Sequence, residues 1–273
     1  MDREALIFLH IPKTAGTTLN RIIEWQYNPV SIFTVDPHRI RATAARFKRF
    51  SEQRRRRFRV VRGHLLYGIH EFLPQGATYI TMLRDPVARL LSTYSFILRR
   101  PLHPLHRKLK AGRLGVEDLI RMTPHRQNLQ CRFISGIGTG GNCDERVLEV
   151  AKENLTRAFR VVGLCEQFQE SLCLMMAAFG WKVPFYDSWK VAKTRPSIEP
   201  DVIDVIREHN RLDVELYDFA KKLFEENLRS NSSAISEGLA TFNSRRELGA
   251  FKKSLYSTLG AGRFLVTKAV SAL

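Results

Sequence analysis

One feature constrains the fold of this chain more than any other: an apolar run, a loop with proline and glycine, and a helical pattern, in that order. The run covers Ala5–His10, and the loop reads His10-Ile11-Pro12-Lys13-Thr14-Ala15-Gly16-Thr17-Thr18. Because Leu19, Ile22 and Ile23 then recur at helical spacing, we expect a strand, a loop and a helix. The amino end of such a helix offers backbone N–H groups and positive partial charge, which favour phosphate or sulfate.

Three further short apolar runs predict strands, namely Phe58–Val61, Ala77–Leu83 and Arg160–Leu164. Helical patterns lie between and after them, at Pro86–Arg99, Asp144–Phe159, Phe168–Gly180 and Pro200–Asn227. Short strands that alternate with helices indicate an α/β fold in three layers, with a central parallel sheet flanked by helices.

Ligands of parallel sheets bind beyond the carboxyl ends of the strands. The first loop, His64, Arg84 and the segment after Leu164 all follow the end of an expected strand. We therefore expect these positions to meet at one edge of the sheet.

The loop differs from the Walker A phosphate loop, GxxxxGK[ST], in which lysine follows the second glycine. Here Lys13 precedes Gly16 by three residues, and Thr17 and Thr18 follow the glycine. No clear Walker B carboxylate follows a strand, because Asp85 is explained as a helix N-cap. The sequence therefore predicts a phosphate-binding loop that works without a metal.

The chain is strongly basic, with 44 Lys and Arg against 27 Asp and Glu and a formal charge of +17. Eleven of these cations fall within Arg39–Arg62, together with a single acid, Glu52. Such a field attracts nucleic acid, acidic glycan, anionic lipid or a phosphate-rich cofactor, and the alternative is a solvated helix face. No nucleic-acid-binding module is recognisable, so we expect no nucleic-acid partner.

Composition also bounds the organisation of the 273 residues. No apolar run approaches the ~18 residues of a membrane-spanning helix, and the first apolar stretch is too short for a secretory signal, so we expect a cytoplasmic protein. The four cysteines show no zinc or disulfide spacing. We divide the chain into a main domain, 1–228, and a basic extension, 229–273, that is helical or partly disordered. An interfacial helix in that extension would allow peripheral membrane contact.

Two motifs resemble those of sulfotransferases that use 3′-phosphoadenosine 5′-phosphosulfate (PAPS). The loop His10–Leu19 resembles their 5′-phosphosulfate loop, above all in the branch of the heparan sulfate 2-O- and 6-O-sulfotransferases and their bacterial relatives. Leu83–Ser92 resembles their 3′-phosphate motif. Arg62-Gly63-His64 lies where the uronyl 2-O-sulfotransferases carry His-Gly-His, and Val162–Phe168 and Leu212–Tyr217 resemble later blocks. The resemblance spans about residues 5–225 and implies a P-loop-type fold, PAPS as cosubstrate and no metal.

The resemblance assigns the first loop to the 5′ end of PAPS. Lys13 would stabilise charge on the bridging oxygen of the leaving phosphate. Gly16 lets the backbone approach the ligand, while Thr17 and Thr18 offer hydroxyls and amides. The range Thr14–Ala15 would contribute main-chain N–H groups.

The same resemblance assigns three further residues to the nucleotide. Arg84 offers a planar fork to the 3′-phosphate, and Ser92, two turns into the next helix, offers a hydroxyl to the same group. Arg195, in the segment Lys193-Thr194-Arg195, resembles the late basic loop that closes over the nucleotide.

A base must take the proton of the acceptor hydroxyl as the S–O bond forms. His64 follows a strand and Gly63 and matches the family histidine, so we expect it to be catalytic together with Lys13. His70 is a second candidate for the base. His10, at the end of the first strand, is expected to orient the loop.

These observations predict a sulfotransferase that moves a sulfuryl group from PAPS to a hydroxyl of a carbohydrate or glycolipid. An anionic glycan acceptor would suit the basic Arg39–Arg62 region. Two alternatives stay open: a P-loop kinase-like phosphotransferase, and a basic non-enzymatic protein that binds polyanions.

Overall fold

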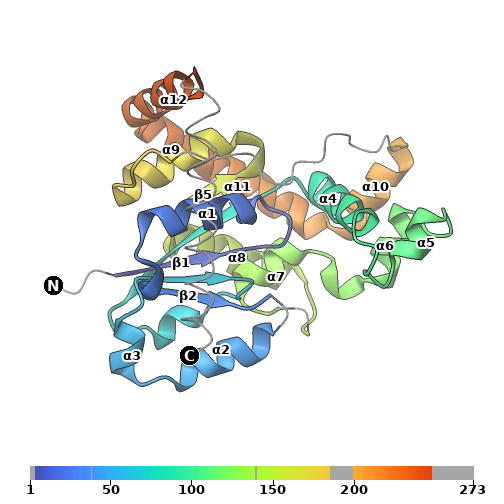
Figure 1. The fold of residues 1–273 in the computed structure, drawn as a ribbon. Coiled ribbons are helices and arrows are strands. Elements are labelled where there is room, and N and C mark those ends of the chain that lie inside the picture. Colours follow the sequence, from blue (N-terminus) through green and yellow to red (C-terminus); the bar gives the residue numbers. More distant parts are fainter. Residues whose placement is uncertain (1–3, 38, 139, 185–198, 248–273) are drawn as a thin grey trace.

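A parallel sheet of five strands forms the centre of the protein (Figure 1). The computed structural model describes residues 4–37, 39–138, 140–184 and 199–247. The strands are β1 (Ala5–Leu9), β2 (Ile32–Val35), β3 (Val60–Gly63), β4 (Ala77–Leu83) and β5 (Phe159–Leu164), in the spatial order β2-β3-β1-β4-β5. All the pairings are parallel, so every strand ends at the same edge.

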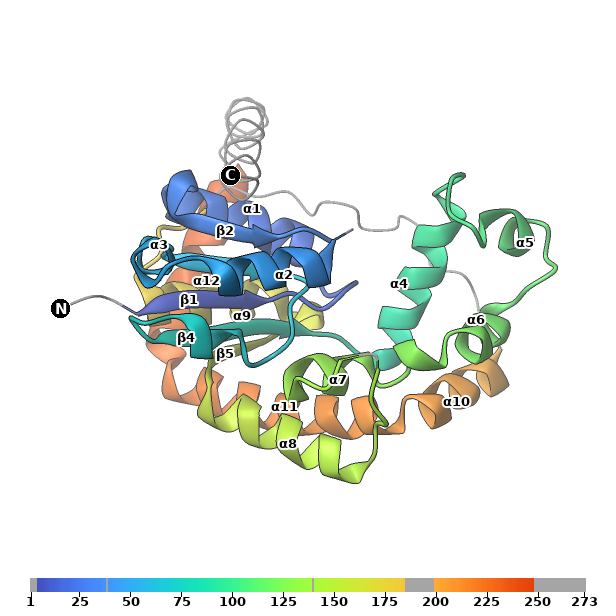
Figure 2. The same ribbon diagram turned by 90° about the horizontal axis from the view of Figure 1, so that it is seen from below.

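Helices cover both faces of this sheet. They are α1 (Gly16–Gln26), α2 (Ile40–Arg49), α3 (Glu52–Arg56), α4 (Pro86–Leu98), α5 (His106–Lys110), α6 (Val116–Met122), α7 (Leu129–Ser135), α8 (Glu145–Arg157), α9 (Phe168–Phe179), α10 (Pro200–His209), α11 (Arg211–Ser230) and α12 (Ser232–Glu247). Helices α1 and α9 lie on one face, with α12 packed on α9, and α2 and α8 lie on the other (Figures 1 and 2). The expected three-layer α/β fold is confirmed. Among the described residues, no helix combines the length and apolar character that crossing a membrane requires.

The core explains why the predicted strands read as apolar runs. Ile7, Phe8 and Leu9 of the central strand are fully buried, as are Val61 and Ile80 of its two neighbours. A parallel sheet with helices on both faces buries both sides of each strand, so the apolar residues are continuous rather than alternating.

One strand and one helix differ from the sequence-based expectation. The strand β2 was not predicted, because four residues at the edge of a sheet give a weak pattern. The helix expected at Pro200–Asn227 is broken at Asn210, whose side-chain oxygen accepts a hydrogen bond from the backbone N–H of Asn128 (3.1 Å). That contact separates α10 from α11.

The extension expected after residue 228 is helical where it is described. Helix α11 continues to Ser230, and α12 begins at Ser232. Ile235 and Phe242 of α12 belong to the main hydrophobic core. The division of the chain at residue 228 stays a prediction, and residues 248–273 lie outside the described part.

Helices α4, α5, α6 and α10 form a smaller unit beside the carboxyl edge of the sheet, which we call the arm (Figure 2). It has its own hydrophobic cluster, which contains Leu90, Ile97, Leu109, Leu119 and Ile206. No helix was expected from the sequence between Pro101 and Arg113, where α5 lies. Helices α5 and α6 have only five and seven residues, so each gives a weak pattern; α5 packs on α4, and α6 packs on α4 and α10.

A buried ion pair links β3 to α1. The Arg62 guanidinium donates to Glu24 (2.6 Å), to the backbone oxygen of Asn20 (2.7 Å) and to the hydroxyl of Thr34 (3.1 Å). Arg62 is 1% exposed and Glu24 is fully buried. This residue of the basic Arg39–Arg62 region is therefore structural and does not face an anionic partner.

We expect Glu24→Ala to destabilise the protein by about 3–5 kcal/mol, because it leaves the Arg62 charge buried and without its carboxylate. Urea unfolding of the variant against the wild type measures this loss. The double variant Arg62→Leu with Glu24→Leu should lose less, since both charges leave together.

The matched control is Glu153→Ala, which removes one partner of the exposed pair Arg157–Glu153 (2.5 Å). Exposed pairs contribute little, so the midpoint of unfolding should stay close to that of the wild type. A loss in Glu24→Ala no larger than that of the control would contradict the assigned role.

Candidate active site

The ends of four strands meet at one edge, as the sequence predicted. Leu9 of β1 pairs with Gly63 of β3, and Leu83 of β4 pairs with Leu164 of β5. Since β1 also pairs with β4, the loops that follow these strands emerge side by side. His10, His64, Arg84 and Glu166 are carried by these loops.

The loop after β1 holds an unusual backbone conformation. Lys13 (φ 73°) and Ala15 (φ 56°) both adopt positive φ angles, which cost about 1–2 kcal/mol each for residues other than glycine. The hydroxyl of Thr14 is buried and donates to the backbone oxygen of Ile11 (2.8 Å), which closes the loop. The N-cap residue of α1, Ala15, provides no side-chain cap. The first amides of α1 are therefore open to an anion.

Gly16 is required by the close approach of the His10 ring. A Cβ atom at this glycine would lie 1.8 Å from His10 Nε2. The ring stacks on Phe8, with centroids 5.4 Å apart, and burial lowers the pKa of His10 well below its usual value. Coupling to His64 and the positive charges of Arg62 and Lys13 lower this pKa further. His10 is thus a neutral ring that supports the loop.

His64 is held in one tautomer. Its Nδ1 lies 2.8 Å from the backbone oxygen of His10, and because a carbonyl only accepts, Nδ1 carries the proton and Nε2 keeps its lone pair. Burial lowers the pKa of His64, and the hydrogen bond to His10 opposes part of that effect. At neutral pH the side chain is therefore uncharged and able to accept a proton at Nε2.

His70, the second candidate base, does not lie at this edge. Its Nδ1 is 2.9 Å from the hydroxyl of Tyr79, which also accepts from the backbone N–H groups of Gly68 and His70. Tyr79 lies five residues before Arg84 along β4, about 16 Å at the usual rise of a strand. His70 therefore fastens a loop to the sheet, and the geometry favours His64 as the base.

Arg84 joins the two predicted motifs. Its Nη1 donates to the backbone oxygen of Lys13 (3.2 Å), and its Nε is buried and has no hydrogen-bond partner among the described residues. Glu166, which follows β5, lies 3.9 Å from the same Nε. Asp85 accepts from the N–H of Ala88 (2.8 Å) and starts α4, as predicted.

Lys13 reaches the helix that carries Ser92. Its ammonium lies 4.4 Å from the centre of the Phe96 ring. Phe96 follows Ser92 by four residues on α4, so the two residues share one face of that helix. Together with the Arg84 contact, this arrangement brings Lys13, Arg84 and the Ser92 face of α4 into one site.

The other predicted residues are placed as follows. Thr17 is half-buried in the first turn of α1, and Thr18 is buried, with its N–H already donating to Ala15 (3.0 Å). Arg195 lies outside the described residues, so its assignment stays a prediction. Within the described part of the chain, no group of three or more His, Cys, Asp or Glu residues could hold a metal ion.

Sequence reasoning missed Gln130 and Glu166, which both contact the Arg84 residue. The side-chain oxygen of Gln130 accepts from the Arg84 N–H (3.0 Å), and its amide nitrogen donates to the Arg84 carbonyl (2.9 Å). Gln130 lies on α7, where no local pattern signals function. Glu166 had a signal, because it follows the end of a strand.

The basic Arg39–Arg62 region is divided between the two edges of the sheet. Helix α2 begins after β2 at the carboxyl edge, whereas α3 immediately precedes β3 and thus lies at the opposite edge. The cations of α3 are therefore remote from the site.

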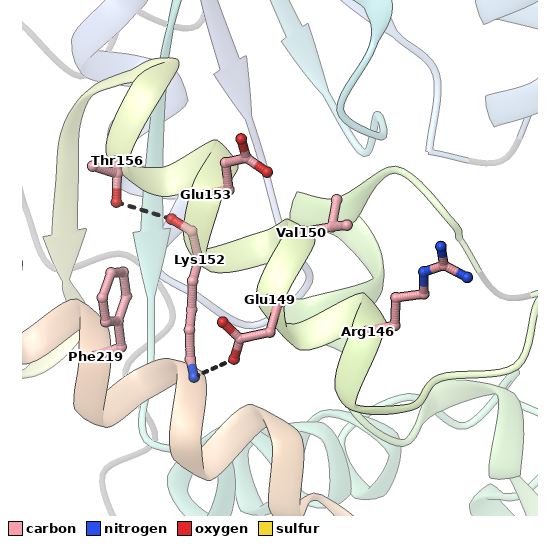
Figure 3. Close-up of a pocket in the computed structure, with 7 residues that line it drawn as sticks. All are labelled: Arg146, Glu149, Val150, Lys152, Glu153, Thr156 and Phe219. Atoms are coloured by element: carbon pink, nitrogen blue, oxygen red, sulfur yellow. Dashed lines mark hydrogen bonds and ion pairs between the residues drawn. The ribbon is translucent and has the colours of Figure 1, made fainter.

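A shallow groove of about 420 Å³ lies between α8 and α11 (Figure 3). It is lined by Arg146, Glu149, Val150, Lys152, Glu153, Thr156 and Phe219. The Lys152 ammonium is paired with Glu149 (2.7 Å). None of the predicted site residues lies there, so the groove is separate from the site.

Comparison with known proteins agrees with this geometry. A sequence profile described as Galactose-3-O-sulfotransferase matches residues 1–248. The chain belongs to this family. The resemblance to sulfotransferases, inferred from the two motifs, is thereby confirmed.

Two human relatives show how far the similarity extends. Heparan-sulfate 6-O-sulfotransferase 1 is 26% identical over 82% of this chain and 66% of its own length. Galactose-3-O-sulfotransferase 2 is 24% identical over 64% of this chain and 47% of its own length. The chain thus spans just under two thirds of the first relative and about half of the second.

Two solved structures are also similar. A sulfotransferase from Alicyclobacillus acidocaldarius has 17% identity and a TM-score of 0.47, covering 82% of this chain and 97% of that chain. Mouse sulfotransferase SULT7A1 complexed with PAP has 18% identity and a TM-score of 0.38, covering 88% of this chain and 89% of that chain.

We expect Gly16→Ala to destabilise the protein by about 1–3 kcal/mol, because the added methyl group displaces the His10 ring from its stack. Chemical denaturation measures the loss. Gly140→Ala is the control, since a Cβ atom there meets nothing within 4 Å. Equal stability of Gly16→Ala and the wild type would contradict the close approach.

Proposed function

We propose that this protein transfers the sulfuryl group of PAPS to a hydroxyl of a carbohydrate acceptor. The observation that carries the proposal is the hydrogen bond between Arg84 Nη1 and the Lys13 carbonyl (3.2 Å). It joins two residues 71 positions apart, one in the loop that resembles a 5′-phosphosulfate loop and one in the motif that resembles a 3′-phosphate motif. Membership of the Galactose-3-O-sulfotransferase family supports the reaction class.

The residues present fit a doubly anionic nucleotide. The buried Arg84 Nε lacks a hydrogen-bond partner among the described residues, and the amino end of α1 lacks a side-chain cap. The loop Lys13–Thr18 would hold the 5′ end, Arg84 and Ser92 the 3′-phosphate, and Arg195 is a further predicted contact. PAPS supplies an activated sulfuryl group whose leaving group is a phosphate.

Lys13 provides charge stabilisation. An ammonium beside the bridging oxygen favours departure of the phosphate, because negative charge develops there as the S–O bond breaks. The ring of Phe96 holds this ammonium at the face of α4, where a cation–π contact stabilises it. The loop conformation fixes the backbone, so little rearrangement is needed on binding.

His64 acts as the general base. As the acceptor oxygen bonds to sulfur, its proton moves to Nε2 of His64, and the bond between sulfur and the bridging oxygen breaks. The products are the sulfate ester, adenosine 3′,5′-bisphosphate (PAP) and a protonated His64 that returns its proton to water. The bond from Nδ1 to the His10 carbonyl orients the ring throughout.

The charge of the arm supports the proposal that the carbohydrate acceptor is anionic. No acidic residue occurs between Pro86 and Val116. The arm exposes the cations Arg99, Arg100, Arg107, Lys108, Lys110 and Arg113. These charges lie beside the carboxyl edge of the sheet, unlike those of α3 (Figure 2). The names of the two human relatives specify heparan sulfate and galactose as their acceptors.

We expect PAP without Mg²⁺ to raise the melting temperature. At a concentration one hundred times its Kd, a ligand that binds only the native state stabilises it by about 2.7 kcal/mol. Differential scanning fluorimetry with PAP, AMP and ATP with Mg²⁺ measures the shift. A larger shift with ATP and Mg²⁺ would indicate a phosphotransferase, and equal responses to PAP and AMP would indicate a general polyanion-binding protein.

We expect His64→Ala to lower kcat by about 10²–10⁴-fold and to leave the affinity for PAP unchanged, because the base does not hold the nucleotide. In the wild type, kcat/KM should rise with pH through the lowered pKa of His64, below 6.5, and then level off. Transfer of ³⁵S from labelled PAPS to a panel of glycans measures kcat and the pH dependence of kcat/KM, and calorimetry measures the affinity for PAP.

His70→Ala is the matched control, since His70 contacts Tyr79 away from the site. It should lower stability and retain kcat. Full activity of His64→Ala, or equal losses in the two variants, would remove His64 from the mechanism.

A further inference from the structure

The side-chain amide of Gln130 makes the hydrogen bonds to the Arg84 backbone that a neighbouring strand would otherwise make. Arg84 is the first residue after β4, and its N–H and carbonyl both bond to the Gln130 amide, at 3.0 and 2.9 Å. Gln130 is fully buried. These two hydrogen bonds fix the peptide groups on both sides of the Arg84 Cα atom, and with them the direction in which the Arg84 side chain leaves the backbone.

Gln130 is itself held by a carboxylate from another helix. Asp213 of α11 accepts the backbone N–H groups of Gln130 (3.1 Å) and Cys131 (2.9 Å) at the start of α7. The N-cap residue of α7, Asn128, makes no side-chain cap bond of its own. Asp213, fully buried, therefore supplies the cap from a distance in sequence.

The same carboxylate faces the helix of the 3′-phosphate motif. Arg89 Nη2 of α4 lies 3.7 Å from Asp213 Oδ2, and both side chains are buried. Arg89 follows Arg84 by five residues. The contacts thus form a closed path from the Arg84 backbone through Gln130 and Asp213 to Arg89, and back along α4.

We propose that Gln130 is a positioning residue for recognition of the 3′-phosphate, which it controls by fixing the backbone of Arg84. The proposal rests on the proposed function. Within the described residues, the side chain of Gln130 bonds to Arg84 and its backbone N–H bonds to Asp213, and neither contacts loop 10–18. Loss of its side-chain bonds should therefore weaken binding of the 3′-phosphate more than binding at the 5′ end, which Gln130 reaches only through the bond from Arg84 to the Lys13 carbonyl.

The test compares PAP with AMP, which lacks the 3′-phosphate, by isothermal titration calorimetry. Gln130→Met keeps the length of the side chain and removes both hydrogen bonds to Arg84. The affinity for PAP should fall about tenfold, the equivalent of the two lost bonds, while the affinity for AMP changes less than about twofold. The preference for PAP over AMP therefore falls.

The matched control is Gln127→Met, on the segment that leads into α7. Gln127 bonds to the Ile120 carbonyl and to His209 and does not contact Arg84. Its preference for PAP should equal that of the wild type. The proposal would be overturned if Gln130→Met lost PAP and AMP binding equally or lost neither. It would also be overturned if the control lost the same preference for PAP.

In Gln130→Glu, lowering the pH should restore the preference for PAP, which a merely structural role of Gln130 would not predict. A protonated carboxyl group accepts from N–H and donates to a carbonyl as the amide does, whereas a carboxylate only accepts. The preference for PAP, relative to the wild type at the same pH, should recover as the pH falls from 8.5 to about 5.5. A ratio that does not change with pH would contradict the proposal, and this variant also decides the question if Gln130→Met does not fold.

The two proposals fail in different ways. If the wild type binds PAP no more tightly than AMP, the proposed nucleotide site is wrong whatever Gln130 does. If the wild type prefers PAP and the Gln130 variants keep that preference, only the positioning role is wrong.

Discussion

The central place of β1 in the parallel sheet is the constraint on which the site depends. Because β1 pairs with β3 on one side and β4 on the other, the loops after all three strands emerge next to one another. The hydrogen bond from Arg84 to the Lys13 carbonyl and the bond from His64 to the His10 carbonyl both span adjacent strand ends. Each pairs a side chain with the backbone of the β1 loop. The loop after β1, Arg84 and His64 are thus ordered by one register.

Electrostatics in this site favours an anionic ligand and a neutral base at the same time. Burial of the ring lowers the pKa of His10 most, and the positive charges of Arg62 and Lys13 lower it further. His64 is likewise kept neutral by burial. The cations near His10 favour phosphate and help to keep that ring neutral, whereas the lowered pKa of His64 arises from burial.

The parts of the site that could be predicted are those with local signals. The turn after β1 combines an apolar run, a glycine and a helical pattern, and Asp85 with Pro86 marks the start of α4. Gln130 could not be found in this way, because its partner Arg84 is 46 residues away and Asp213 is 83 residues away. The burial of Arg62 was equally inaccessible, since a charged residue is normally exposed and its partner Glu24 is 38 residues distant. The break at Asn210 depends on a contact with Asn128, which periodicity does not contain.

The ion pair between Arg62 and Glu24 has a consequence for α1. Glu24 lies about two turns beyond Gly16, where the helix begins at the anion-binding loop. Anchoring the helix there sets its rotation about its own axis, and with it the directions of its first amides. The direction of those amides is thus set in the protein interior, by a buried ion pair.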